Sequence, residues 1–89
     1  DRYERHAAIE AEIVLKEVQQ ACTAAGVSVE LCHRIDSHPY RAILATAAEK
    51  GCDLIVMASH GRRGLSALLL GSETQKVLTH SELPVLVVR

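Results

Sequence analysis

The 89 residues carry ten lysines and arginines against eleven aspartates and glutamates, and 48% of them are hydrophobic. This composition predicts a folded globular chain, and the balanced charge gives no reason to expect binding to nucleic acid or to an anionic membrane surface. No apolar run approaches the roughly 18 residues of a membrane span, and no signal-peptide pattern is present, so we expect a cytoplasmic location.

The hydrophobic residues are small and aliphatic, because the sequence has no Phe or Trp and two Tyr. Such side chains suit helices packed closely on a buried parallel sheet. The cysteines, Cys22, Cys32 and Cys52, are odd in number and form no CxxC pair. This spacing disfavours a disulfide framework or a compact zinc knuckle, and it predicts reduced thiols in the core. A native metal site is not expected either, because the adjacent Cys32 and His33 would point to opposite faces of a strand.

The first 25 residues have apolar side chains at spacings of three and four, which predicts a helix with one apolar stripe. Gly26 is predicted to end this helix as its C-terminal cap. Residues 27–31 then alternate apolar and polar side chains. This alternation is typical of a strand with one face open to water, so we expect a strand near the edge of a sheet.

A second helix is predicted from Pro39, which is tolerated in a first helical turn, after a segment in which Asp36 or Ser37 can cap the helix. Gly51 is predicted to end it. Residues 53–58 form a short apolar run bounded by turn signals. This run indicates a fully buried central strand.

A third helix is predicted to begin near Ser72, because Ser72 and Gln75 have the spacing of a reciprocal capping pair. Residues 84–88 are predicted to form the last strand. The alternation of helices and strands indicates an α/β fold, a three-layer sandwich whose parallel strands are joined by right-handed crossovers. Ligands bind such sheets beyond the carboxyl ends of the strands, which points to the segment after Ala58.

That segment contains clustered glycines, Gly61, Gly64 and Gly71, directly before the predicted third helix. Glycine lets backbone N–H groups approach a phosphate, and a helix N-terminus offers unpaired donors. Arg62 and Arg63 could add forked hydrogen bonds to phosphate oxygens. The spacing matches neither the dinucleotide fingerprint nor the P-loop, so a plain tight connection between strand and helix stays open as an alternative.

Residues 53–72, together with the final apolar run, resemble the carboxyl-terminal half of the universal stress protein family. ATP-binding members of that family carry a Gly, two residues, a second Gly, nine residues, and a third Gly followed by Ser or Thr. In this sequence the second and third glycines fall on Gly61 and Gly71, and the hydroxyl falls on Ser72. Ala58 stands where the first glycine is expected.

The resemblance implies that residues 1–89 are the carboxyl-terminal part of a single universal stress protein domain. This part is incomplete at its amino-terminal side, because it lacks the strand, helix and strand with which the family domain begins. The family's sheet order, 3-2-1-4-5, places two strands between the run at 27–31 and the run at 53–58. We therefore expect these two runs not to be neighbours.

The resemblance also implies a function, a regulatory module in the stress response that binds ATP, with or without magnesium. No residue stands out as catalytic, so at most slow hydrolysis is expected. The expected nucleotide-binding residues are Ala58, His60, Gly61, Arg62, Gly71, Ser72 and Glu73.

A homodimer through the last strand is implied as well, formed by Val85, Leu86, Val87 and Val88. The alternative function, which the alanine at position 58 favours, is a dimerising interaction module of the same fold that binds no nucleotide.

Overall fold

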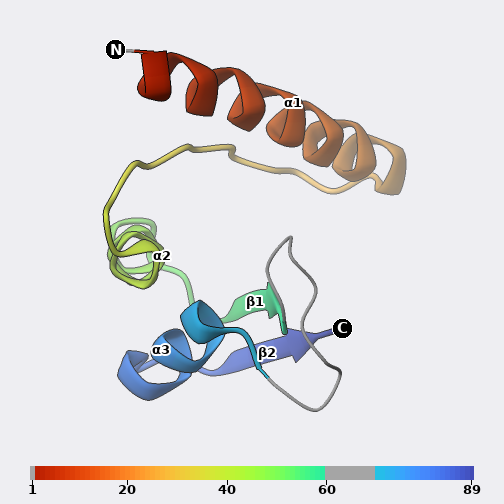
Figure 1. Cartoon of the computed structure of the whole chain (residues 1–89). Coiled ribbons are helices and arrows are strands. Elements are labelled where there is room, and N and C mark those ends of the chain that lie inside the picture. The colour runs from red at the N-terminus through yellow and green to blue at the C-terminus, as the bar shows by residue number, and fades with distance from the viewer. Residues whose placement is uncertain (1, 60–69) are drawn as a thin grey trace. The chain divides into compact units, whose positions relative to one another are not determined.

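The computed structural model describes residues 2–59 and 70–89. The chain divides into two compact units, residues 1–34 and 35–89 (Figure 1). The first unit holds helix α1 (Arg2–Ala25), and the second holds α2 (Pro39–Glu49), β1 (Ile55–Ala58), α3 (Ser72–His80) and β2 (Val85–Val88). The three predicted helices and the last two predicted strands are confirmed.

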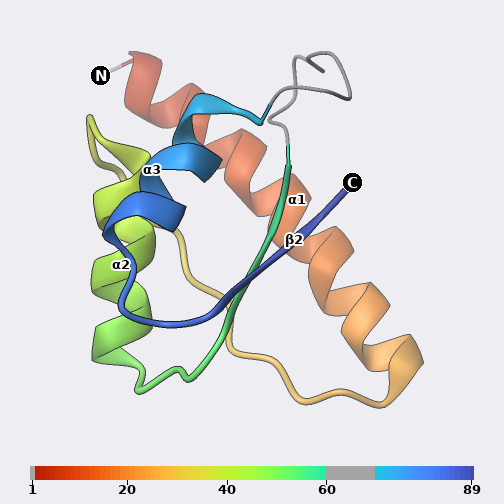
Figure 2. The same ribbon diagram turned by 90° about the horizontal axis from the view of Figure 1, so that it is seen from below.

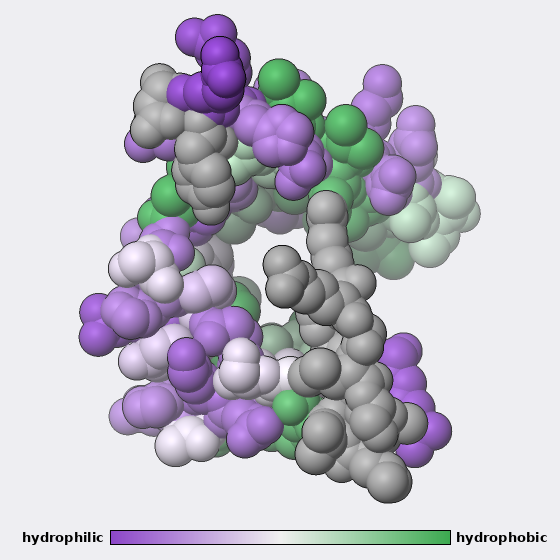
Figure 3. All heavy atoms as spheres, viewed as in Figure 1, coloured by the Kyte–Doolittle hydropathy of each residue, from purple (hydrophilic) through white to green (hydrophobic). Residues whose placement is uncertain are grey.

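Helix α1 ends at the predicted glycine. Gly26 has a φ of 71°, its N–H donates to the Thr23 carbonyl at 3.1 Å, and the Val27 N–H donates to the Cys22 carbonyl at 2.8 Å. These two bonds form a Schellman motif, which satisfies carbonyls that the end of a helix leaves without partners. Figure 3 shows hydrophobic residues along α1 between hydrophilic ones.

The strand predicted at residues 27–31 is wrong, because the structure assigns no strand to this segment. Residues 27–31 do alternate apolar and polar side chains, but this pattern is not sufficient for a strand. A strand also needs a neighbouring strand that completes its backbone hydrogen bonds. Among the described residues, the only sheet is the pair β1 and β2. The segment therefore has no ladder to join.

Strands β1 and β2 are parallel, with Ile55 opposite Val85 and Ala58 opposite Val88. The ladder is closed at both ends by backbone bonds. The Ile55 N–H donates to the Pro84 carbonyl at 3.0 Å, and the Ser59 N–H donates to the Val88 carbonyl at 2.6 Å. The carboxyl ends of both strands therefore lie at the same edge of the sheet.

Helices α2 and α3 cover one face of this sheet and lie side by side (Figure 2). The core between them is built from Ala47 of α2, Ile55 of β1 and Val77 of α3, which is fully buried. Half-buried side chains surround it, namely Tyr40, Ile43, Leu44, Met57, Leu83 and Val85. On the side seen in Figure 3, the surface over these two helices is mostly hydrophilic.

The other face of the sheet carries apolar side chains that stay exposed, with Val56 at 57% and Leu86 at 52% of their area accessible. The prediction of a fully buried strand at 53–58 is therefore wrong, because Ile55 is the only buried residue of this run and Met57 is half-buried. Parallel strands are buried on both sides only when helices cover both faces. In the described part of residues 35–89, α2 and α3 pack on the same face.

The end of α2 yields a prediction about stability. Gly51 has a φ of 64°, and a Cβ added there would meet nothing within 4 Å. Gly51→Ala is therefore expected to lower the free energy of unfolding by about 1 kcal/mol through backbone strain alone. Gly51→Asn should cost less, since asparagine tolerates the left-handed conformation. Urea unfolding measures both, and equal stability of the alanine variant and the wild type would contradict the assignment.

Candidate functional site

The carboxyl end of β1 and the start of α3 are joined directly. The Gly71 N–H donates to the Ser59 carbonyl at 2.7 Å, and the Thr74 hydroxyl donates to the Ala58 carbonyl at 2.9 Å. Thr74 is only 3% exposed, and Ser59 is also buried. These bonds hold the first turn of α3 at the carboxyl edge of the sheet, where ligands of parallel sheets bind.

The capping of α3 differs from the prediction. Gly71 is the N-cap, with an extended backbone at φ −61° and ψ 151°, and its carbonyl accepts the first helical bond, from the Gln75 N–H, at 3.0 Å. The reciprocal pair predicted for Ser72 and Gln75 is wrong, because Ser72 already lies inside the helix. The Gln75 side chain donates instead to the Leu70 carbonyl at 2.9 Å.

The first turn of α3 presents backbone donors at this edge. Because the first helical bond comes from Gln75, the N–H groups of Ser72, Glu73 and Thr74 have no carbonyl partner within the helix. They lie at the positive end of the helix dipole, and Ser72 is exposed. This arrangement is suited to an anion such as phosphate. The Gly71 N–H, which we expected to serve a phosphate, is engaged by Ser59.

Of the predicted nucleotide-binding residues, Ala58, Gly71, Ser72 and Glu73 come together at this junction. His60, Gly61 and Arg62 fall outside the described residues, as does Arg63. Their assignment therefore stays a prediction.

The alanine at the first glycine position of the motif does not strain the backbone. Ala58 ends strand β1, and among the described residues no non-glycine residue has a positive φ. The position therefore does not need the left-handed freedom that only glycine supplies cheaply.

The Glu73 side chain points away from the backbone donors of its own helix. Its Oε1 accepts a hydrogen bond from the Tyr40 N–H of α2 at 3.0 Å, and its Oε2 accepts one from the Lys76 ammonium at 3.1 Å. The N-cap of α2, His38, makes no side-chain capping bond. Glu73 therefore supplies the cap that α2 lacks.

The prediction that Asp36 or Ser37 caps α2 is wrong, because the N-cap is His38. Asp36 Oδ1 accepts a hydrogen bond from the His38 N–H at 2.8 Å, which shapes the turn before α2 but does not reach into the helix. Sequence analysis missed the contact between Glu73 and Tyr40 because 33 positions separate these residues. Capping signals are local, so no pattern in the sequence pointed to it.

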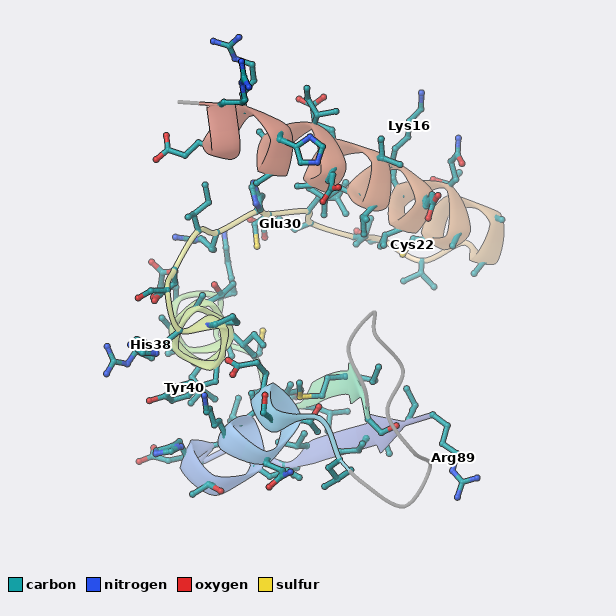
Figure 4. All side chains as sticks on the ribbon, viewed as in Figure 1. Lys16, Cys22, Glu30, His38, Tyr40 and Arg89 are labelled. Atoms are coloured by element: carbon teal, nitrogen blue, oxygen red, sulfur yellow. The ribbon has the colours of Figure 1, made fainter. Side chains whose placement is uncertain are left out.

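The surroundings of Glu73 keep it charged. The hydrogen bond from Lys76 lowers the pKa of the Glu73 carboxyl, the Tyr40 N–H and the charge of His38 act in the same direction, and partial burial opposes them. The Tyr40 ring lies 5.0 Å from the His80 ring, and the Lys76 nitrogen lies 5.9 Å from the Tyr40 ring centroid. Figure 4 shows His38 and Tyr40 together beside α2.

A cavity of about 300 Å³ lies at the carboxyl-terminal ends of α2 and α3. Its lining includes Leu44, Cys52, His80 and Leu83.

The cysteines do not lie in the core, where the sequence predicted them. Cys52 and Cys32 are free and exposed, and Cys22 is free and half-buried, so this prediction is wrong. Within the described part of the chain, no three His, Cys, Asp or Glu side chains gather into a group that could hold a metal ion. None of the described helices has the length and apolar character that a membrane crossing needs.

Comparison with known proteins gives consistent matches. The sequence model of the universal stress protein family matches residues 1–89. Universal stress protein MJ0531 of Methanocaldococcus jannaschii is 35% identical over 80 residues, which are 90% of this chain and 46% of that protein. YxiE of Bacillus subtilis, also a universal stress protein, is 38% identical over 76 residues, 85% of this chain and 51% of that protein.

Among solved structures, that of protein MJ0577 matches 98% of this chain and 60% of its own, with a TM-score of 0.87 and 31% identity. The α/β fold with a parallel sheet is thereby confirmed. The chain spans about half the length of the universal stress proteins MJ0531 and YxiE. Since the family model covers the chain from end to end and the fold agrees, this chain belongs to the universal stress protein family.

Proposed function

We propose that this chain carries the phosphate-binding part of an ATP-binding regulatory module that acts in the stress response. The observation that carries the proposal is the first turn of α3. Three backbone N–H groups without carbonyl partners in the helix are held at the carboxyl edge of a parallel sheet by the bonds from Gly71 to Ser59 and from Thr74 to Ala58. Universal stress protein membership supports the regulatory role.

In this proposal the N–H groups of Ser72, Glu73 and Thr74 donate to phosphate oxygens, and the exposed Ser72 hydroxyl adds a fourth donor. His60, Gly61 and Arg62 complete the site from the segment that precedes α3. Gly71 does not donate its own N–H to phosphate in this proposal, because this N–H donates to the Ser59 carbonyl. Gly71 instead joins the start of α3 to the end of β1.

The proposal is limited to binding, with slow hydrolysis at most. Turnover of ATP requires a group that orients or deprotonates the attacking water. Glu73 is a carboxylate in the first turn of α3, and its two oxygens accept hydrogen bonds from the Tyr40 N–H and the Lys76 ammonium. It is therefore not placed to serve as a general base or as a magnesium ligand.

Titration of magnesium-ATP into the protein, followed by calorimetry, tests the site. The wild type is expected to bind one equivalent at micromolar concentration. Ser72→Asp should weaken binding by at least about fivefold, because a negative charge would then face the phosphates. The same substitution favours the helix by about 0.5 kcal/mol, so loss of binding could not be ascribed to unfolding.

Ser72→Asn is the matched control, since it has nearly the same size as the aspartate but no charge. It should lose only the hydroxyl contact and bind clearly better than Ser72→Asp. Equal affinities of the two variants would contradict a phosphate at this helix start. No heat from the wild type would favour the second candidate, an interaction module that binds no nucleotide.

A specific observation favours that dimerising role of β2 as an additional property. The Pro84 carbonyl accepts a bond from Ile55 of β1, and the Val88 carbonyl accepts one from Ser59, directly after β1. Backbone N–H and C=O groups of successive residues point to alternate sides of a strand. Those of Val85 and Val87 therefore point to the side of β2 that faces away from β1, and the described residues place no further strand there. Such an edge is a template for pairing, and a two-fold axis would pair β2 with its copy.

Proline at position 87 tests this dimer. Val87→Pro removes an N–H from the open edge and none that bonds to β1, so it should convert the dimer to a folded monomer. Val87→Ala shortens the side chain but keeps the N–H, and it should stay dimeric. Light scattering after size exclusion gives the mass, and circular dichroism confirms the fold. A folded Val87→Pro variant that remains a dimer would show that β2 is not the interface.

A further inference from the structure

The first turns of α2 and α3 lie next to each other, and a single carboxylate contacts both. Glu73 is the second residue of α3, and its Oε1 accepts the N–H of Tyr40, the second residue of α2. Tyr40 is half-buried at the start of α2 (Figure 4). Its ring lies near the His80 ring and the Lys76 ammonium of α3. The contact is therefore part of the packing between α2 and α3.

The Glu73 carboxylate has a second set of donors within its own helix, the N–H groups at the start of α3. A carboxylate in the first turn of a helix is attracted to the positive end of that same helix. There it would compete with a phosphate for the N–H groups of α3. Instead, Lys76 holds Oε2 at 3.1 Å and Tyr40 holds Oε1 at 3.0 Å, so both oxygens have partners away from these donors.

Helix α2, in turn, depends on Glu73 for its start. Its N-cap His38 contributes no side-chain capping bond, and the Tyr40 N–H is one of the four donors that a helix start leaves without a partner. Glu73 satisfies this donor with a charged acceptor, which is the stronger kind of hydrogen bond. Order in the first turn of α2 is thus tied to the position of α3.

We propose that Glu73 is a positioning residue that couples the phosphate site at the start of α3 to the first turn of α2. This inference rests on the proposed function, because the coupled ligand is the ATP phosphate. Glu73 fixes the two helix starts relative to each other and keeps its charge away from the donors of α3. Since coupling is reciprocal, bound ATP must also stabilise the bond between Glu73 and the Tyr40 N–H.

The test combines three variants with two measurements. Glu73→Ala removes both contacts, whereas Glu73→Gln keeps an oxygen that can accept the Tyr40 N–H. Glu82→Gln is the control, since it makes the same change at an exposed glutamate just beyond α3. ATP affinity is measured by calorimetry at a temperature at which circular dichroism shows every variant to be folded. Hydrogen exchange at the Tyr40 amide is followed by NMR with and without magnesium-ATP.

Glu73→Ala is expected to bind ATP about five- to tenfold more weakly and to exchange its Tyr40 amide faster even without nucleotide. Glu73→Gln should bind within about threefold of the wild type, because the oxygen that accepts the Tyr40 N–H is retained. ATP should slow Tyr40 exchange in the wild type and in Glu73→Gln, and it should leave exchange unchanged in Glu73→Ala. Glu82→Gln should match the wild type in both measurements.

Two outcomes overturn the coupling alone. Unchanged ATP affinity in a Glu73→Ala variant whose Tyr40 amide exchanges faster would make Glu73 a cap of α2 and nothing more. Equal weakening in Glu73→Gln and Glu73→Ala would show that the bond to Tyr40 does not carry the effect. If the wild type binds no ATP, the proposed function fails and the coupling fails with it, which calorimetry of the wild type shows by itself.

Discussion

The hydrogen bond from the Gly71 N–H to the Ser59 carbonyl is the constraint on which the candidate site depends. It closes the base of the segment between β1 and α3, and Ser59 also donates to Val88 at the end of β2. One buried residue thus links both strands to the start of α3. The bond from Thr74 to Ala58 repeats the link one turn further along the helix. The direction of α3, and with it the direction of the backbone N–H groups in its first turn, follows from these contacts.

Local signals predicted the elements well. Gly26 and Gly51 adopt the positive φ values expected after helices, and Pro39 occupies the first turn of α2. Interactions between distant residues were not predictable in the same way. The run at 27–31 has the side-chain pattern of a strand, but a ladder also requires a neighbour. The cap of α2 comes from Glu73, and nothing in the pattern around Pro39 indicates a partner so far along the chain.

The sequence predicted where the residues of the candidate site lie more accurately than it predicted what each of them does. Glycine at 71 and a hydroxyl at 72 do lie at a helix start beyond a parallel strand, as the motif indicated. The capping role moved by one position, because the N-cap of α3 is Gly71 and Ser72 is the first residue of the helix. A difference of one residue decides which N–H groups remain for a ligand. Only the observed bond from Gln75 to Gly71 settles that register.

The charges around the start of α3 explain how an acidic residue can be compatible with an anion site. A free carboxylate at position 73 would oppose a phosphate through like charge. The Lys76 ammonium and the Tyr40 N–H in the first turn of α2 compensate this charge. Compensation of this kind is conditional, since it holds only while α2 and α3 remain in contact. In the proposed coupling, phosphate binding depends on the packing of the neighbouring helix, and such a dependence serves regulation better than turnover.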